Sequence, residues 1–286
     1  MNKFVAVLVS LYCTSLSAQS CEQLCNKEWL STATTEDIQL VIDAGADLTA
    51  RDSTGKTALH WTGFQPTWHT SDRVAEKVSM LVEAGADPEA KDDHGSTVLY
   101  YLAQGRSVAA MNVLIDAGAN IEEPSIDGLR PLHSAVLYGT VQNVSALLEA
   151  GADVMGIDQL GLSPLHRAAG RANRYTVNVI LQAGADVNAI SSSGYTPLFR
   201  AVYGRSTVDF VQLFLVAGAN INVQDNEGNT PLHRSVGPSA KPEIVAYLLE
   251  IGADPTVRNA DGQSPCDVAL NRIKQSDVYE ALCAEQ

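Results

Sequence analysis

The sequence has few basic residues for its length. Only 19 Lys and Arg stand against 33 Asp and Glu in 286 residues, so the formal net charge at pH 7 is −14. Binding to nucleic acid depends on clustered Lys and Arg that neutralise phosphates. The shortage of these residues therefore argues against a nucleic-acid partner, and it fits either a simply solvated surface or a basic partner.

After residue 18 the sequence also lacks any apolar run long enough to span a bilayer. Its one apolar run, at 4–11, follows a basic residue and precedes small residues that end at Ala18. This order predicts a signal peptide over 1–18, cleaved after Ala18 or alternatively after Ser20. We therefore expect an exported protein, in the periplasm or outside the cell. Cys21 leaves a lipoprotein as the alternative, although the residues before it fit a lipobox poorly.

Known catalytic motifs are missing as well. The sequence contains no Walker loop, no His-Glu-x-x-His and no dinucleotide-binding glycine triplet. The segment from Gly161 to Leu165 has the first glycine of a nucleophile elbow but lacks the second. We therefore predict no catalytic residues and no cofactor.

The sequence has instead a repeat of 33 to 34 residues. A Gly-Ala-Asp or Gly-Ala-Asn motif starts at 45, 85, 118, 151, 184, 218 and 252, and a leucine recurs with the same spacings from 59 to 232. Two markers that keep one period indicate stacked copies of one unit, because a single unit cannot bury its own apolar face. The spacing of 40 from 45 to 85 indicates an insertion of seven residues, which we predict to be a loop within 64–72.

Each unit has the pattern of a turn, a short helix, a second short helix and a turn. Ser163 is a suitable cap for a first helix, and Pro164 suits its first position, where a missing N–H costs nothing. Val144, Leu147 and Leu148 stand at positions i, i+3 and i+4, which predicts one apolar stripe on a second helix. The glycine that follows each second helix suits a left-handed closing position.

These units resemble the ankyrin repeat family, whose signature is Thr-Pro-Leu-His-x-Ala. The best matches are Ser-Pro-Leu-His at 163–166 and Thr-Pro-Leu-His at 230–233, with weaker matches at 57–60, 130–133 and 196–199. The resemblance implies an all-α solenoid of stacked helix-turn-helix units, with about six full repeats between capping half-repeats. We place the N-terminal capping repeat at 19–50, the full repeats at 51–258 and the C-terminal capping repeat at 259–286.

The histidines His60, His133, His166 and His233 hold one repeated position. Equivalent residues of neighbouring repeats lie roughly 10 Å apart, the usual helix-packing distance. A metal ion needs its ligands about 2 Å away, so these side chains cannot share one ion. The resemblance implies that each histidine hydrogen-bonds its own turn, and we predict no metal site.

Four cysteines follow the predicted signal peptide, at the two ends of the array: Cys21, Cys25, Cys266 and Cys283. The two ends lie several helix spacings of about 8–10 Å apart, whereas a disulfide needs Cα atoms closer than about 7 Å. Pairing within each end remains. Cys266 and Cys283 occupy core positions of the last two helices and should face each other. The pairing of Cys21 with Cys25 is less secure, because a spacing of four on a regular helix strains the bond.

Candidate binding residues are those that the repeat does not explain. In the turns, the two positions before the glycine and the one after it are expected to point outward. Apolar residues occupy five of these positions in three successive turns: Ile126, Leu129, Leu160, Leu162 and Tyr195. Adjacent tips would join them into one exposed patch, and such patches usually mark interfaces. The alternative is that some leucines fold back onto neighbouring turns.

Two further groups are candidates for binding a partner. Aromatic residues, which are common interface anchors, gather around the insertion. Arginine follows the tetrad in three neighbouring repeats, where it forms a basic stripe for an acidic partner segment or pairs with Asp or Glu of its own chain. The aromatic group is Trp61, Phe64 and Trp68, and the basic stripe is Arg167, Arg200 and Arg234.

The expected function is binding of another protein by an exported array that is monomeric by itself and has no catalytic activity. Fingertips and the concave helix face are the surfaces with which arrays of this kind typically bind. One alternative is an inhibitor or immunity-type protein that blocks an exported enzyme. The other is a stress-protective accessory of a periplasmic enzyme, which some periplasmic ankyrin-like proteins resemble.

Overall fold

The computed structural model describes residues 24, 26–63, 71–203, 206–237, 240–269 and 277–284. Within these ranges the helices follow one another as eight pairs, and the only strand-like feature is an isolated bridge between Lys91 and Thr97. The predicted all-α solenoid of helix-turn-helix units is therefore confirmed. The chain divides into two compact units, 1–152 and 153–286.

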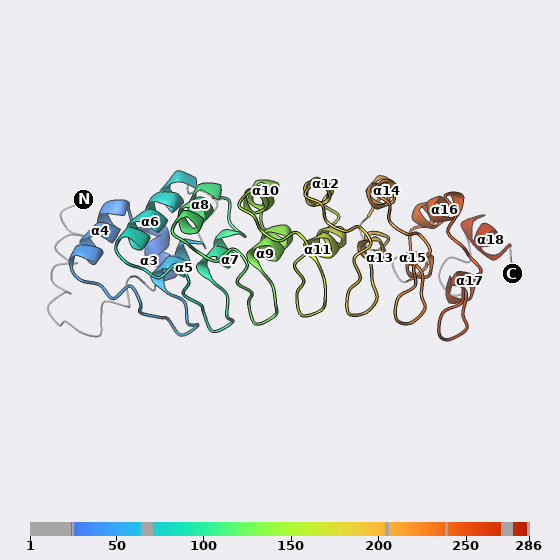
Figure 1. The fold of residues 1–286 in the computed structure, drawn as a ribbon, viewed down its shortest axis with the longest axis horizontal. Coiled ribbons are helices and arrows are strands. Elements are labelled where there is room, and N and C mark those ends of the chain that lie inside the picture. Colours follow the sequence, from blue (N-terminus) through green and yellow to red (C-terminus); the bar gives the residue numbers. More distant parts are fainter. Residues whose placement is uncertain are drawn as a thin grey trace. The chain divides into compact units, whose positions relative to one another are not determined.

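The first unit contains four helix pairs. Helix α6 packs on α4 and on α8, and α9 packs on α7 and on α10. In Figure 1 the odd-numbered helices of this unit form one row and the even-numbered helices a second row. The helices are α3 (Lys27–Thr32), α4 (Thr35–Asp43), α5 (Ala58–Thr62), α6 (Ser71–Glu83), α7 (Val98–Leu102), α8 (Val108–Asp116), α9 (Pro131–Tyr138) and α10 (Val141–Glu149).

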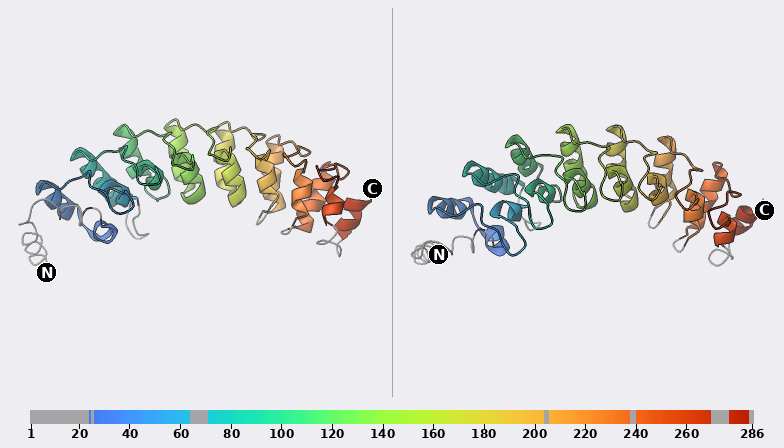
Figure 2. Two further views of the ribbon diagram at one scale, coloured as in Figure 1. Left: turned by 90° about the horizontal axis from the view of Figure 1, so that it is seen from below. Right: turned by 60° about the horizontal axis from the view of Figure 1, so that its bottom comes forward.

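The second unit repeats this arrangement with four more pairs. Helix α13 packs on α11, α14 and α15, and α16 packs on α14, α15 and α18. Figure 2 shows from two further sides that the pairs of this unit follow one another in chain order. The helices are α11 (Pro164–Arg171), α12 (Arg174–Gln182), α13 (Pro197–Ala201), α14 (Val208–Val216), α15 (Pro231–Ser235), α16 (Pro242–Glu250), α17 (Pro265–Ala269) and α18 (Asp277–Cys283).

The first helix of a repeat begins where the sequence predicts. In α11 the hydroxyl of Ser163 accepts a hydrogen bond from the backbone N–H of His166 at 3.4 Å, and Pro164 is the first helical residue. This cap satisfies an N–H that the helix itself leaves without a partner. The same cap starts α15 at Thr230.

The core of each unit lies between the two helix rows. The repeated leucine of the first helices is buried throughout, as at Leu165 and Leu198, both 0% exposed. The second helices contribute the predicted stripe: Val144 and Leu147 are fully buried and Leu148 is half-buried. Burial of a leucine or valine side chain contributes about 1.5–3 kcal/mol, so each of these positions stabilises the array.

Between the helix pairs the chain forms projecting turns, here called fingers, which are visible below the helices in Figure 1. Gly161 at the tip of one finger has φ +68°, a conformation that side-chain-bearing residues rarely adopt. Neighbouring fingers are joined by backbone hydrogen bonds. Ser192 donates to the carbonyl of Leu160 at 3.1 Å, and Asn226 donates to the carbonyl of Ser193 at 3.2 Å. Within a unit, neighbouring fingers therefore hold one another in place.

The inserted segment of the first full repeat differs from the prediction. Helix α6 begins at Ser71, so the last two residues of the predicted 64–72 loop are helical, and 64–70 lie outside the described residues. Asp72 in the first turn favours this early start, because a negative charge there complements the helix dipole.

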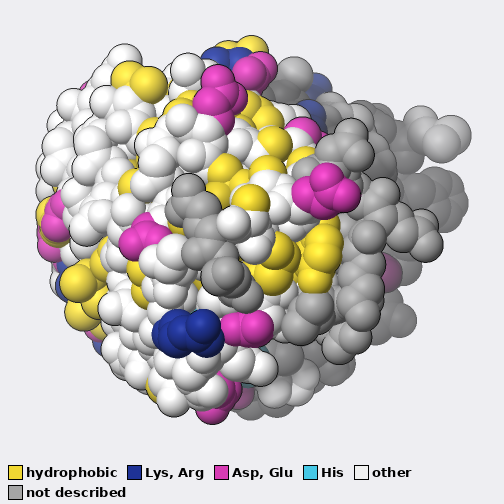
Figure 3. Space-filling view, turned by 90° about the vertical axis from the view of Figure 1, so that its right-hand side faces the viewer, with side chains coloured by type: hydrophobic (Ala, Val, Ile, Leu, Met, Phe, Trp, Pro, Cys, Tyr) yellow, Lys and Arg dark blue, Asp and Glu magenta, His cyan; other side chains and the backbone are white. Residues whose placement is uncertain are grey.

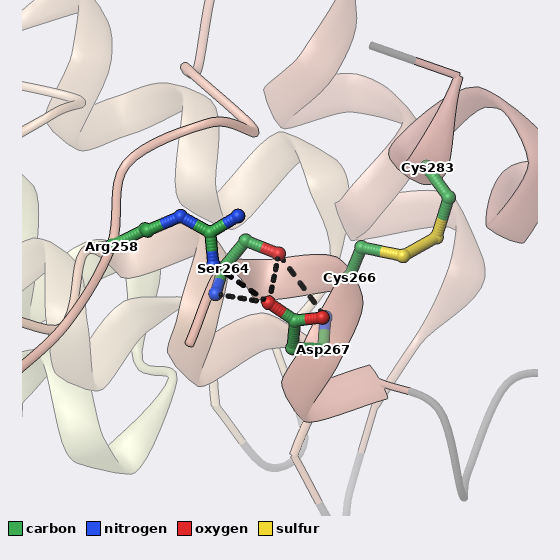
Figure 4. Close-up of a disulfide and its surroundings, with 5 residues drawn as sticks. All are labelled: Arg258, Ser264, Cys266, Asp267 and Cys283. Carbon is green, nitrogen blue, oxygen red and sulfur yellow. Dashed lines mark hydrogen bonds and ion pairs between the residues drawn. A yellow bond between two sulfur atoms is a disulfide. The ribbon is translucent and has the colours of Figure 1, made fainter. Parts of the chain in front are cut away.

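At the C-terminal end a disulfide joins Cys266 of α17 to Cys283 of α18, with the Cα atoms 5.3 Å apart (Figure 4). Beside it, Asp267 accepts hydrogen bonds from the backbone and hydroxyl of Ser264 and lies 3.2 Å from the guanidinium of Arg258. Figure 3 shows this end of the second unit, where apolar side chains lie near the middle of the face and Asp and Glu side chains around them. The other predicted disulfide, Cys21–Cys25, lies outside the described residues.

Opening this disulfide should loosen the last repeat. For a loop of this length a disulfide contributes about 3 kcal/mol, mainly by restricting the unfolded chain. Replacing both Cys266 and Cys283 by Ser should therefore lower the free energy of unfolding by that order, measured by urea denaturation. Peptide mapping without reductant should recover the two cysteine peptides joined in the native chain, and recovery of both as free thiols would contradict the assignment.

Candidate functional site

Four fingers are organised around an aspartate at their base. In the finger at 158–162, Oδ1 of Asp158 accepts hydrogen bonds from the backbone N–H groups of Leu160 at 2.8 Å and Leu162 at 3.0 Å. Asp52, Asp92 and Asp225 hold their own fingers in the same way. We call these side chains the finger anchors. They fix the backbone of the fingertips, so little backbone conformational entropy is lost there on binding.

The two leucines of this finger have different environments. Leu160 is 60% exposed, whereas Leu162 is only 4% exposed. The prediction that Leu162 points outward is therefore wrong, and the alternative, that it folds back, holds for it. The positive φ of Gly161 turns the chain between the two residues, so they do not share a face. The position after the glycine is also buried at Lys56 and Ser96.

The remaining predicted fingertip residues are partly or largely exposed. Ile126 is 62% exposed and Leu129 is half-buried in the first unit, and Tyr195 is half-buried in the second. Their joining into a single patch with Leu160 stays a prediction, because the five residues belong to different units. The sequence analysis missed Ile157 and Ile190, which are 56% and 66% exposed. Each directly precedes the base of a finger, and comparing that position between repeats would have revealed them.

The two leucines allow a direct test of these environments. Leu162→Ala should lower the free energy of unfolding by about 2–4 kcal/mol, because it leaves a cavity in packed surroundings. Leu160→Ala should change it by less than about 0.5 kcal/mol, because the side chain is mostly in solvent. Urea denaturation of both variants checks this, and equal losses would contradict the difference in burial.

Of the aromatic group, only Trp61 falls within the described residues, since Phe64 and Trp68 lie in the segment 64–70. Trp61 is half-buried, and its indole N–H donates to Oδ2 of the anchor Asp52 at 2.9 Å. Lys56 lies 5.7 Å from the centre of its ring. These contacts give Trp61 a role in holding its own finger.

Two of the three arginines of the basic stripe pair with an anchor of their own repeat. Nε of Arg167 donates to Oδ2 of Asp158 at 2.9 Å, and its Nη2 donates to the same oxygen. Nη2 of Arg234 lies 3.7 Å from Oδ2 of Asp225. For these two residues the alternative holds, in which the arginines pair within the chain. In both cases the arginine follows its anchor by nine residues.

Arg200 is different because the residue nine positions earlier is Ser191, which has no charge. Its Nε is buried without a hydrogen-bond partner, and it forms no ion pair with any residue in the described ranges. Burial lowers the pKa of Arg200, and the charge of Arg167 lowers it further, whereas Asp158 acts in the opposite sense. The spacing of nine between anchor and arginine was the sequence signal that could have singled out this residue.

A groove with a volume of about 470 Å³ lies beside Arg200. The ring of Tyr195 stacks on Phe199 with centroids 5.4 Å apart, and the guanidinium of Arg234 lies 4.6 Å from the Tyr195 ring centre. Tyr203 is 50% exposed. We call this the Arg200 groove, and its lining residues are Gly170, Arg171, Ala172, Tyr195, Phe199, Arg200, Tyr203 and Arg234.

The repeat that supplies most of this groove also departs from the signature tetrad. Phe199 stands where four of the other tetrads have histidine. The hydroxyl of Thr196, the cap of α13, is buried and has no hydrogen-bond partner. Within the described residues, two buried polar side-chain atoms have no hydrogen-bond partner, Thr196 Oγ1 and Arg200 Nε. Such atoms are rare in folded proteins and call for an explanation.

Three histidines of the tetrads, His60, His166 and His233, each connect two repeats. Nδ1 of His166 accepts a hydrogen bond from the backbone N–H of Ser163 at 3.1 Å, so its proton is on Nε2, which donates to the carbonyl of Tyr195 at 2.8 Å. His60 and His233 make the equivalent pairs of bonds. The structure thus extends the predicted bond to the histidine's own turn by a second bond to the next repeat. Both ring nitrogens are occupied.

Burial lowers the pKa of His166 to about 4, and it also lowers the pKa of His60 and of His233. The pKa of an unfolded histidine is about 6.5. Between these values the unfolded chain binds a proton that the folded chain does not, so the free energy of unfolding falls as the pH falls.

For His166 alone this loss should reach roughly 3 kcal/mol between pH 6.5 and pH 4. In His166→Gln, urea denaturation over this range should show a slope of stability against pH that is smaller by up to one proton. Comparing slopes separates the titration from the general cost of the substitution. Equal slopes in the two proteins would contradict a neutral, buried His166.

Across the part of the chain that the structure describes, no three His, Cys, Asp or Glu side chains are grouped as metal ligands. No helix in the same ranges has the length and apolar character needed to cross a membrane.

Comparison with known proteins agrees with this architecture. Models of ankyrin repeats match residues 70–158, 160–192, 180–235 and 219–269. The ankyrin repeat domain of human ASB11 is 27% identical, with 81% of this chain and 98% of that chain covered and a TM-score of 0.68. The ankyrin repeat domain of Bcl-3, described as a unique member of the IkappaB protein family, is also 27% identical, with 82% and 99% covered and a TM-score of 0.63. A search of curated proteins gave no match.

Proposed function

This chain belongs to the ankyrin repeat family, and we propose that it is an exported platform that binds another protein and has no catalytic activity. Domains of this family typically serve as protein–protein interaction modules. The observation that carries the proposal is a set of exposed apolar side chains on anchored fingers of the second unit: Ile157, Leu160 and Ile190.

The construction of the fingers supports binding rather than chemistry. Asp158 fixes the backbone around Leu160, and a backbone hydrogen bond ties this finger to the next at Ser192. A preformed surface of this kind gains affinity because binding orders few additional groups. The apolar side chains would supply affinity, and the polar residues around them would supply specificity.

The proposed export rests on the leader pattern at 1–18 and agrees with the disulfide between Cys266 and Cys283. Disulfides persist in oxidising compartments such as the periplasm and the extracellular space. A mature chain that begins at Gln19 or Cys21 in an exported fraction would support this part of the proposal, and an intact chain retained in the cytosol would overturn it.

The binding proposal predicts that the exposed fingertips determine affinity. A triple variant with Ser at Ile157, Leu160 and Ile190 should bind a partner captured from the exported fraction about 10- to 100-fold more weakly, as expected for loss of interface anchors. Its melting temperature should not fall, because these side chains are largely exposed. Val216→Ser, which removes an 80% exposed side chain from α14, is the matched control and should bind normally.

The outcome also separates the alternatives. If the captured partner is an enzyme that loses activity in the complex, the chain is an inhibitor or immunity-type protein. If the enzyme keeps its activity and survives stress better, the chain is an accessory, and a non-enzyme partner indicates a scaffold. Unchanged affinity of the triple variant would contradict the role of the fingertips.

A further inference from the structure

We infer that the Arg200 groove binds a carboxylate of an acidic segment in a partner protein, next to an apolar side chain of the same segment. This inference rests on the proposed function, because it names the chemistry of one site on the binding platform. Four features of the second unit support it. Arg200 has no ion-pair partner, its guanidinium packs against Gly170, the groove has aromatic walls, and this repeat departs from the repeat pattern.

The first feature is the charge that Arg200 brings to the groove. Arg167 and Arg234 each pair with an anchor, Asp158 and Asp225, whereas Arg200 has none. Asp158 has no remaining capacity for it, because one of its oxygens accepts two backbone N–H groups and the other accepts both donors of Arg167. Arg200 therefore forms no ion pair with a described carboxylate, although the protein has a net charge of −14.

The second feature is the position of the Arg200 guanidinium. It lies so close to α11 that a Cβ atom added at Gly170 would be 2.9 Å from Nη2 and 3.0 Å from Nε. The absence of a side chain at Gly170 thus makes room for the guanidinium at the wall of the groove. Packing against α11 restricts this side chain before binding, and because Nε is buried, a planar carboxylate would bind the Nη groups.

The third feature is the aromatic character of the walls. Tyr195 stacks on Phe199, and Tyr203 exposes half of its surface at the same groove. Such rings offer apolar contact area at low entropic cost. A segment that places a Glu or Asp beside a leucine or an aromatic residue would therefore match the groove. A basic segment would be repelled by Arg200 and Arg234.

The fourth feature is that this repeat contains two buried polar atoms without hydrogen-bond partners, which lowers its stability. A desolvated charge without a partner is unfavourable, and the hydroxyl of Thr196 adds a second unpaired group. Arg200 lacks a partner because Ser191 stands in place of an acidic anchor. Thr196 lacks one because Phe199 stands in place of histidine. Local violations of an otherwise regular pattern are typical of functional sites. A ligand carboxylate would provide the anion that Ser191 does not.

A display library of random 12-residue peptides, screened against the folded full chain, tests the inference. Enriched peptides should contain Asp or Glu beside an apolar residue. Arg200→Gln should weaken their binding by about 10- to 100-fold, the loss expected when hydrogen bonds to a charged group are removed. Arg258→Gln removes a charge from the same unit outside the groove and should bind normally. A peptide with each Glu and Asp changed to Gln and Asn should bind the native chain as weakly as the original binds Arg200→Gln.

Two measurements separate this loss from misfolding. Arg200→Gln should melt no lower than the native chain, because Arg200 has no ion pair to lose, whereas Arg167→Gln should melt lower, because it leaves buried Asp158 without its partner. Gly170→Ala should weaken peptide binding by displacing the Arg200 guanidinium, while leaving the melting temperature unchanged or higher, since alanine favours a helix.

Several outcomes would overturn the inference. These are enriched peptides without acidic residues, acidic peptides that bind Arg200→Gln normally, an absence of any enriched peptide, and competition by inorganic phosphate but not by the acidic peptide. If peptides bind the native chain and Arg200→Gln equally but lose affinity for the triple fingertip variant, the inference fails and the proposed function stands. If the captured protein partner depends on neither site, the role of the fingertips fails as well.

Discussion

Stacking of each repeat on the next is the constraint on which the structure depends, because no single helix pair can bury its own apolar face. The repeated leucines, such as Leu165 and Leu198, are buried between the two helix rows of their unit. Hydrogen bonds then fix how one repeat lies on another. His166 joins its own cap at Ser163 to the next finger at Tyr195, and its burial there keeps the imidazole neutral.

The fingers follow from the same constraint, and they connect the fold to binding. A buried anchor such as Asp158 satisfies two backbone N–H groups at the tip, while its second oxygen receives Arg167. The backbone of the tip is thereby fixed, and the charges of Asp158 and Arg167 neutralise each other. The outer side chains of the tip can contact a partner. The repeat at 191–203 keeps the geometry but lacks the acidic anchor, so Arg200 forms no ion pair with a described residue. A regular scaffold thus makes a single irregular repeat chemically distinct.

Local sequence rules predicted the fold well. Ser163 and Pro164 mark the start of a helix through their own backbone chemistry, and an apolar stripe such as Val144 and Leu147 needs only helical periodicity. The fingertips were less predictable. Leu160 and Leu162 look alike in the sequence, and their different burial follows from the turn at Gly161 and from contact with the neighbouring finger. The insertion was also misjudged in part, since helix α6 extends into it from Ser71.

The sequence by itself determined the repeat, its period and its helix boundaries, because these depend on residues close together in the chain. It also determined that Arg167, Arg200 and Arg234 hold one repeated place. The tertiary structure showed what the spacing of nine residues means, because Arg167 and Arg234 each pair with the aspartate at that distance and Arg200 has Ser191 there. Burial of Arg200 against Gly170 of the preceding repeat is a contact across 30 residues, and no local pattern encodes it.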